Sequence, residues 1–427
     1  MPRPLLLIAI LFMGMGFLRA QPIRNLPDFQ KAAVSYSPGA YDKLNQLRLN
    51  QLQADVQKAQ LLKPQVFLSS DYLLAPFFSN NGQAVAITPN PSSKAFGYDA
   101  ALTNGGLYAA QLNVSYPLLN KPVYQAFAAE NELSRQVLQQ ESKTLLHKLS
   151  NDVTTLYIDC YQTQQQIKYL STLTGLIKER EKVVQSLVEQ GIMSQNDYLL
   201  IDIEISSREF DIAQQKAALC ASFSALNNLC GISDTTVPAL SAPDIALSKI
   251  LDKFNYQQKF SLDSMDLIAQ QQVSNTKYKP QLQLYGNTGL YASDAANIPH
   301  NVGLSAGLHL ALPLYDGHQR NITEQQTKVM LQTLGKYQDD QDLQQKNNFA
   351  SLLQQMNELR LSIGYLDKQI ATQKRLLLLM HYKVASGQIS VTDYLLAVRD
   401  FGIASQNRIQ TQSQLWLLMN QYNYLNW

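Results

Sequence analysis

The sequence predicts a mainly α-helical chain that also contains four β-strands, arranged in a unit that occurs twice. Short motifs recur in the second half of the chain at a constant spacing, and four segments alternate apolar and polar residues. Very long stretches without proline carry apolar residues at three-, four- and seven-residue steps, which is typical of coiled-coil-like helices. The chain has 427 residues, of which 45% are hydrophobic and 16% charged, so it can bury enough apolar surface to fold.

The N-terminus has the features of a secretory signal peptide. Arg3 precedes an apolar run from Leu5 to Leu18, and Ala20 is a small residue at which cleavage can occur. We therefore expect residues 1–20 to be removed and the mature chain to be exported. No later stretch reaches the roughly 18 apolar residues that a spanning helix requires. If the mature chain crosses a membrane, it must do so as a closed β-barrel.

The rest of the chain is predicted to be a duplication. Asp197-Tyr198-Leu199-Leu200 recurs as Asp393-Tyr394-Leu395-Leu396, and Lys63-Pro64-Gln65 recurs as Lys279-Pro280-Gln281. These matches divide the mature chain into a first repeat at 21–240 and a second repeat at 241–427.

Each repeat is predicted to run in the same order: a helix, a β-hairpin and a long helical hairpin. The leading helices are expected at about 40–62 and 244–278, and the β-hairpins at 63–118 and 279–314. The helical hairpins are expected at 122–229 and 318–426, because each breaks once at a glycine, near residues 191 and 387. The turn of the first β-hairpin, at about 75–106, is rich in Pro, Asn, Gly and Ser and is expected to be a long loop.

The predicted strands have one apolar and one polar face. In the strand that returns from the first loop, Leu112, Val114 and Tyr116 alternate with polar residues. Four strands in one chain leave two open edges, and unpaired backbone groups cannot face lipid. Because single-chain barrels begin at about eight strands, several copies would have to join, giving eight strands from two copies or twelve from three. The alternative is an ordinary soluble sheet whose apolar face is packed inward.

The repeated order of elements, with Gly-x-x-Ser-x-x-Asp at both helical breaks, resembles the TolC-like outer-membrane efflux channels. The resemblance covers nearly the whole mature chain. It implies a homotrimer with a twelve-stranded barrel among outer-membrane lipids and a periplasmic α-helical tunnel. It also implies a passive exit duct that docks on a periplasmic membrane-fusion adaptor, which in turn binds an inner-membrane pump of the RND, ABC or MFS type.

The resemblance assigns roles to residues at the two helical breaks. Residues expected to contact the adaptor are Gly191, Ile192, Ser194, Gly387, Ile389 and Ser390. Asp197 and Asp393 are expected to form a periplasmic gate, although Leu396 stands where the family has a further acid. A purely structural alternative is that each aspartate caps a helix and that each glycine occupies a turn with positive φ.

Catalytic chemistry is not expected. Gly303-Leu304-Ser305-Ala306-Gly307 matches the G-x-S-x-G pattern, but it lies inside a predicted strand rather than at a strand-to-helix turn. The five histidines show no metal-binding spacing, so neither a metal nor another cofactor is expected. The net charge of +2 gives no basis for a nucleic-acid partner. The second functional hypothesis is a secreted coiled-coil scaffold or adhesin without a pore.

Overall fold

The computed structural model describes residues 25–88, 90–99, 106–234, 236–251, 253–292, 295–386 and 388–427. The predicted signal peptide at 1–20 lies outside these residues. The chain forms two compact units. We call the first, made of Met1–Ser37, His147–Lys249 and Phe349–Leu425, the tip unit. We call the second, made of Pro38–Leu146, Ile250–Asn348 and Asn426–Trp427, the strand unit.

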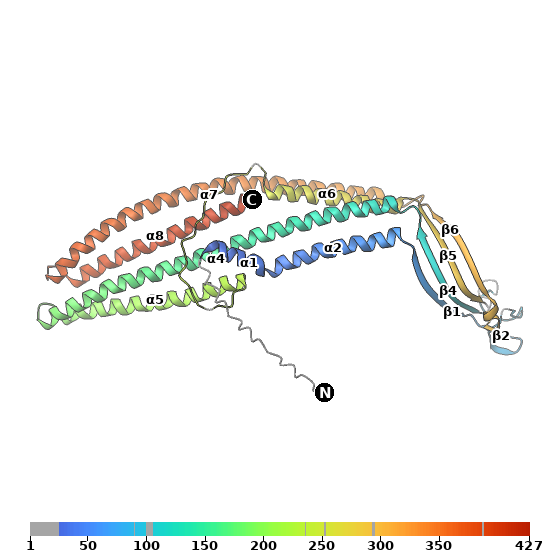
Figure 1. The fold of residues 1–427 in the computed structure, drawn as a ribbon, viewed down its shortest axis with the longest axis horizontal. Coiled ribbons are helices and arrows are strands. Elements are labelled where there is room, and N and C mark those ends of the chain that lie inside the picture. The colour runs from blue at the N-terminus through green and yellow to red at the C-terminus, as the bar shows by residue number, and fades with distance from the viewer. Residues whose placement is uncertain are drawn as a thin grey trace, which may run out of the picture. The chain divides into compact units, whose positions relative to one another are not determined.

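The strand unit contains one four-stranded antiparallel sheet (Figure 1). Its strands, in the spatial order of the sheet, are β1 (Gln65–Leu74), β4 (Gly106–Pro117), β5 (Gln281–Ala292) and β6 (Val302–Ala311). The two predicted β-hairpins therefore lie next to each other, with β4 and β5 in the centre and β1 and β6 at the edges. Gly289 in β5 has a φ of +151°, and a Cβ there would meet the carbonyl oxygen of Ala110. Glycine thus allows the two hairpins to pair closely.

The turn of the first β-hairpin differs from the predicted long loop. It contains a second, two-stranded sheet made of β2 (Phe77–Asn80) and β3 (Gln83–Ala86). Asn81 and Gly82 connect these strands with φ values of +48° and +82°. An Asn-Gly pair is the preferred loop of a tight hairpin, because both central residues need positive φ.

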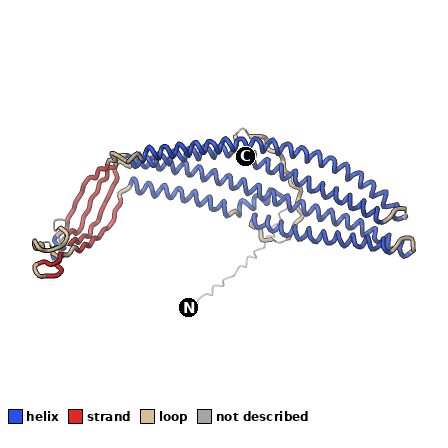
Figure 2. Tube along the Cα trace, turned by 180° about the vertical axis from the view of Figure 1, so that it is seen from behind, coloured by secondary structure: helices blue, strands red, loops and turns tan. Residues whose placement is uncertain are grey.

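Most residues of the chain lie in long helices (Figure 2). They are α2 (Pro38–Leu62), α4 (Lys121–Glu189), α5 (Gln195–Cys230), α6 (Asn255–Asn275), α7 (Gln319–Ala385) and α8 (Val391–Leu425). Short 3-10 helices occupy Thr276–Tyr278 and Ala295–His300. Among the residues described, none of the helices combines the length and apolarity that a bilayer-spanning helix requires.

The helix predicted at about 244–278 begins later than expected, at Asn255. The described residues 241–249 have no regular secondary structure, and side chains of the tip-unit helices hydrogen-bond to their backbone. Tyr157 Oη donates to the carbonyl oxygen of Ser241 (2.7 Å), and Asn423 Nδ2 donates to that of Ala246 (2.7 Å). Asn423 Oδ1 also accepts from the backbone N–H of Ser248 (2.9 Å). These bonds satisfy backbone groups that a helix would otherwise pair internally.

The tip unit has an apolar core that includes a helix missed by the sequence-based prediction. This helix, α1 (Leu26–Tyr36), is capped by Asn25, whose Oδ1 accepts from the N–H of Asp28 (3.0 Å). Its buried Phe29 packs against Tyr157 and Phe223, with ring centroids 5.8 and 6.3 Å away. Burial of the Phe29 ring explains why so short a helix is stable at this position.

Candidate functional site

The four-stranded sheet has one continuous apolar face. The register pairs Val66 with Val114, Leu112 with Thr288, and Thr288 with Leu304. Residues paired in this way project to the same face of the sheet, so the apolar positions of all four strands lie on one face. The large apolar side chains on this face are exposed. They are Val66, Leu68, Tyr72, Leu74, Leu112, Val114, Tyr116, Leu284, Val302, Leu304, Leu308 and Leu310. An exposed apolar surface of this extent requires a covering partner.

The opposite face of the same sheet is more polar, although Phe67, Leu73, Tyr285 and Tyr291 are also exposed on it. Asn113 Nδ2 donates to Ser69 Oγ (2.8 Å) across β1 and β4, and Ser305 Oγ donates to Asn287 Oδ1 (2.7 Å) across β5 and β6. These cross-strand pairs fix the register and leave small polar groups facing outward from the sheet. Ser305, which belongs to the G-x-S-x-G match, is one of them and lies well inside β6.

The tip of the first helical hairpin is a tight turn between α4 and α5. Gly191 has a φ of +74°, and a Cβ placed on it would meet no atom within 4 Å. Glycine is therefore needed here for its backbone conformation rather than for space. Ile192, the next residue, is 58% exposed, so a large apolar side chain faces mostly solvent at the tip.

Ser194 and Asp197 form a capping box at the start of α5. Ser194 Oγ accepts from the N–H of Asp197 (3.3 Å), and Asp197 Oδ2 accepts from the N–H of Ser194 (3.2 Å). The serine hydroxyl also donates to the same carboxylate oxygen (2.7 Å). The alternative interpretation of Asp197 as the N-cap is thus corrected in detail: Ser194 is the N-cap, and Asp197 occupies the third helical position.

The second tip repeats the serine–aspartate pair. Ser390 Oγ accepts from the N–H of Asp393 (3.0 Å) and donates to Asp393 Oδ2 (2.7 Å). Ile389 is the counterpart of Met193, and both pack against the apolar cluster of the tip unit, whereas Gln388 stands in the place of Ile192. Gly387 lies outside the described residues. The two aspartates are therefore structural at both tips, and their expected role as a gate remains a prediction.

Arg180 and His381 form a contact that the sequence-based prediction missed. Arg180 of α4 is only 4% exposed, and its Nη2 contacts both ring nitrogens of His381 of α7, Nδ1 more closely than Nε2 (2.9 Å). It also hydrogen-bonds Tyr394 of α8. The pair therefore links the first helical hairpin to both helices of the second, within the tip unit.

The electrostatics of this contact are unusual. Among the described residues, no carboxylate lies within ion-pair distance of Arg180, and its buried Nε has no hydrogen-bond partner. Burial and the charge of Arg180 lower the pKa of His381, whereas Glu179 opposes that shift. The imidazole is thereby kept neutral and can accept from the guanidinium.

A sequence signal for Arg180 did exist. Leu173, Ile177, Arg180 and Val184 follow the four- and three-residue steps of a buried helical stripe. A charged residue at such a position predicts a specific buried partner. The comparison of the two repeats could not reveal it, because Leu376 is the counterpart of Arg180.

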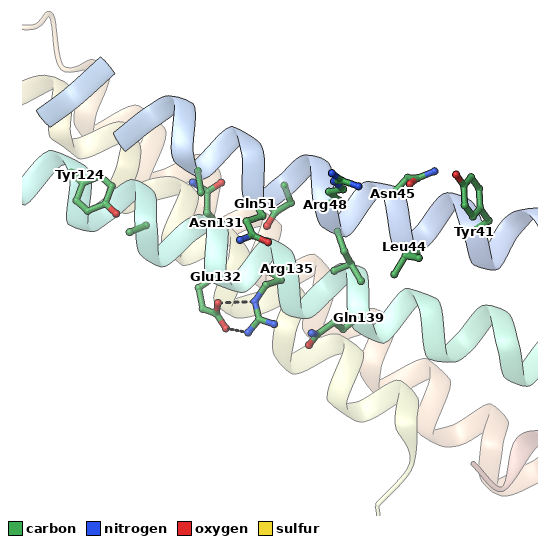
Figure 3. A pocket seen from close by; sticks show the side chains of 14 residues that line it. Tyr41, Leu44, Asn45, Arg48, Gln51, Tyr124, Asn131, Glu132, Arg135 and Gln139 are labelled. Atoms are coloured by element: carbon green, nitrogen blue, oxygen red, sulfur yellow. Dashed lines mark hydrogen bonds and ion pairs between the residues drawn. The ribbon is translucent and has the colours of Figure 1, made fainter. Parts of the chain in front are cut away.

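A cavity of about 720 Å³ lies between α2 and α4 of the strand unit (Figure 3). Two of the charged residues that line the cavity pair with each other: Arg135 Nε donates to Glu132 Oε2 (2.8 Å). Hydrogen bonds from Arg135 and Gln136 lower the pKa of Glu132 to about 2. The residues that line it include no nucleophile paired with a base, and no group of metal-binding side chains occurs in the described part of the chain. The cavity therefore offers no catalytic constellation.

Known proteins resemble the chain in structure rather than in sequence. No protein-family model matches the chain, and no curated protein matches its sequence. Several solved structures do match. The outer-membrane channel OprN superposes with a TM-score of 0.72 at 14% identity, over 94% of this chain and 89% of that one. The outer membrane protein VceC of Vibrio cholerae gives a TM-score of 0.71 at 13% identity, over 94% and 96%.

The CmeC outer membrane channel of Campylobacter jejuni gives a TM-score of 0.71 at 13% identity, over 94% of this chain and 85% of that one. These neighbours are channels and not enzymes. At such low identity the likeness concerns the fold, and it confirms the resemblance found in the sequence. Over nearly its whole length, the chain therefore has the fold of the TolC-like outer-membrane efflux channels.

Proposed function

We propose that this protein is the passive outer-membrane exit duct of a tripartite efflux or type I secretion system. One observation carries the proposal: the sheet of the strand unit exposes a continuous apolar face, and its edges β1 and β6 have no further strand beside them among the described residues. A soluble scaffold or adhesin would have to cover that face with its own residues. In a membrane barrel, lipid would cover the apolar face and water would solvate the polar face, so both faces of the sheet would have a suitable environment.

Three copies would close the sheet. The β1 edge of one copy would pair with the β6 edge of the next, giving twelve strands and removing every open edge. The polar face, with Asn113, Asn287 and Ser305, would line a water-filled lumen. The likeness to outer-membrane channels supports this arrangement and the outer membrane as its location.

The helical hairpins would continue the duct into the periplasm. At about 1.5 Å per residue, the 69 residues of α4 span roughly 100 Å. We assign the contacts with a periplasmic adaptor to the tips, at Gly191, Ile192, Ser194, Gly387, Ile389 and Ser390. Asp197 and Asp393 would place six carboxylates near the threefold axis, where they narrow the entrance and attract cations. An inner-membrane pump of the RND, ABC or MFS type, bound through the adaptor, would supply the energy.

Outer-membrane fractionation followed by electrophoresis with and without heating tests the proposal. We expect a heat-modifiable trimer in the outer-membrane fraction, and the purified trimer should conduct ions in planar bilayers. A soluble monomer in the periplasmic fraction would overturn the proposal in favour of the scaffold or adhesin. A trimer in the membrane that never conducts would overturn the duct but leave the membrane location intact.

A further inference from the structure

Basic residues gather at one end of the four-stranded sheet. The register pairs Gln65 with Ser115 and Gln281 with Ala311, so the starts of β1 and β5 lie beside the ends of β4 and β6. Every strand meets its helical segment at this end, through a short junction. We call the exposed cations of these junctions the basic collar: Lys63, Lys121, Lys277, Lys279 and Arg320.

The basic collar has little opposing charge. The junction segments 59–65, 115–125, 275–283 and 311–321 hold these five cations and one acid, Asp316, which leaves a net charge of 5 − 1 = +4 with histidine neutral. The Asp316 carboxylate accepts from the backbone N–H groups of His318 (3.0 Å) and Arg320 (2.9 Å), so it caps α7. Arg320 forms an ion pair with Glu324 of α7 (3.5 Å). Within the described residues, no carboxylate lies within ion-pair distance of the four lysines.

The sheet beyond the basic collar is almost free of charge. Its four strands contain 10, 12, 12 and 10 residues, and Asp71 is their only acid or lysine/arginine. Strands of about 9–11 residues match the thickness of a bilayer's hydrocarbon layer. The cations therefore lie at the end of a nearly uncharged surface whose length matches the hydrocarbon layer of a bilayer.

The residues beside the cations are typical of a membrane interface. Leu314 and Tyr315 follow β6 and are 89% and 79% exposed. Tyr278, which stands between Lys277 and Lys279, lines a cavity of about 470 Å³ together with Tyr315 and Arg320. Tyrosine rings are enriched at the headgroup level of membranes, and lysine side chains there extend towards the phosphates.

From this arrangement we infer that the basic collar binds the headgroups of anionic phospholipids in the leaflet at the helical end of the sheet. The inference rests on the proposed function, since it requires the apolar face to lie in a bilayer. The ligand must offer an anion directly beside an acyl chain, because the cations border an apolar surface. A phospholipid meets this requirement, whereas a free anion or an acidic protein segment lacks the acyl chain. Bound headgroups would fix the depth at which the sheet sits in the membrane.

Native mass spectrometry of the heat-modifiable trimer tests the inference, with phosphatidylglycerol and phosphatidylcholine as the competing lipids. The variant K63Q/K121Q/K277Q/K279Q removes four charges from the basic collar. The matched control K328Q/K346Q/K368Q/K374Q removes four exposed lysines from α7. Each cation near an anionic surface contributes a factor of about five. We therefore expect a wild-type and control preference for phosphatidylglycerol that falls roughly tenfold or more in the collar variant.

Several outcomes would overturn the inference. One is a wild-type trimer that does not prefer phosphatidylglycerol, and another is a collar variant that keeps the wild-type preference. A third is displacement of the lipid by millimolar inorganic phosphate, which would identify a simple anion site. If the fourfold variant fails to assemble, K63Q/K279Q and the salt dependence of the wild-type preference decide, since screening must weaken it. Absence of any trimer would refute the proposed function, whereas a conducting trimer without lipid preference refutes only the collar.

Discussion

The buried guanidinium of Arg180 donates to the imidazole of His381, and this contact joins the first helical hairpin to the second. It depends on a neutral imidazole, because a protonated ring has no lone pair to offer and would place two cations side by side. The negative charge of Glu179 raises the pKa of His381 and so opposes the effect of Arg180. Arg180 also hydrogen-bonds the side chain of Tyr394. The link between the hairpins should therefore respond to pH.

The first prediction follows from the lowered pKa of His381. The unfolded chain then binds the proton more readily than the folded chain, so stability falls as the pH drops below the ordinary histidine pKa of about 6.5. The loss is complete below the lowered pKa of the folded state. We expect the melting temperature to fall more between pH 7.5 and pH 5.5 in the wild type than in H381Q.

His300 provides the matched control, because it is exposed and lies in the strand unit. H300Q should show the same pH dependence as the wild type. Equal pH dependence of the wild type and H381Q would contradict the role given to the Arg180–His381 contact.

The second prediction concerns Gly191. Because its φ is +74° and no atom crowds the position, G191A should destabilise the protein by about 1 kcal/mol through backbone strain alone. Gly335 lies inside α7, where an added Cβ would likewise meet no atom within 4 Å, so G335A should stabilise by about 1 kcal/mol. Chemical denaturation of the two variants should give opposite signs, and equal signs would refute the strain argument.

The third prediction concerns the two capping serines. S194A and S390A each remove a side-chain acceptor from the first turn of a helix, which costs about 1 kcal/mol. Amide hydrogen exchange in the first turn of α5 should therefore accelerate about fivefold in S194A. Exchange in α8 should stay unchanged in that variant and accelerate in S390A. No acceleration in either helix would show that the hydroxyl groups do not stabilise the tips.

The fourth prediction separates the gate from the cap. D197N/D393N keeps a side-chain oxygen beside Ser194 and Ser390 but removes the charges that the proposed trimer would gather at its entrance. Conductance in planar bilayers should rise, whereas S194A/S390A should raise it much less. Unchanged conductance in D197N/D393N would reject an electrostatic gate and leave the helix-capping role as the explanation of both aspartates.

The fifth prediction compares adjacent residues of β6 that face opposite ways. Leu304 is 83% exposed on the apolar face, whereas Ser305 is bonded to Asn287 on the polar face. L304R should cost about 2–4 kcal/mol when the strand lies near the middle of a bilayer, and S305R should cost much less because it faces the lumen. The measurement is the yield of heat-modifiable trimer in vesicles, and similar yields would contradict the assignment of the faces.

The sheet shows how much of this fold the sequence can predict. Alternation at Leu112, Val114 and Tyr116 identified the apolar face, because a period of two is a local property of one strand. The small hairpin around Asn81-Gly82 carried an equally local signal, but it was obscured by the surrounding Pro, Gly and Ser residues and interpreted as a loop.

Other features depend on partners distant in sequence. The segment before Asn255 is apolar enough to be interpreted as helix, but side chains distant in sequence, Tyr157 and Asn423 among them, hydrogen-bond to its backbone in a non-helical conformation. Likewise, α1 is stable because Phe29 is buried by residues more than a hundred positions away. At the tips, the serine–aspartate pairs were predictable from spacing, whereas the Arg180–His381 contact required the packing of two hairpins.

The small β2–β3 sheet occurs in the first repeat and has no counterpart among the described residues of the second. A ring of three copies would contain six nearly equivalent β-hairpins, so its strands would be arranged with approximate sixfold symmetry. At the rim where the strands turn, however, three bulky protrusions would alternate with three short turns. Anything that recognises the protein from that side, such as a phage or an antibody, would therefore meet a threefold pattern of binding positions.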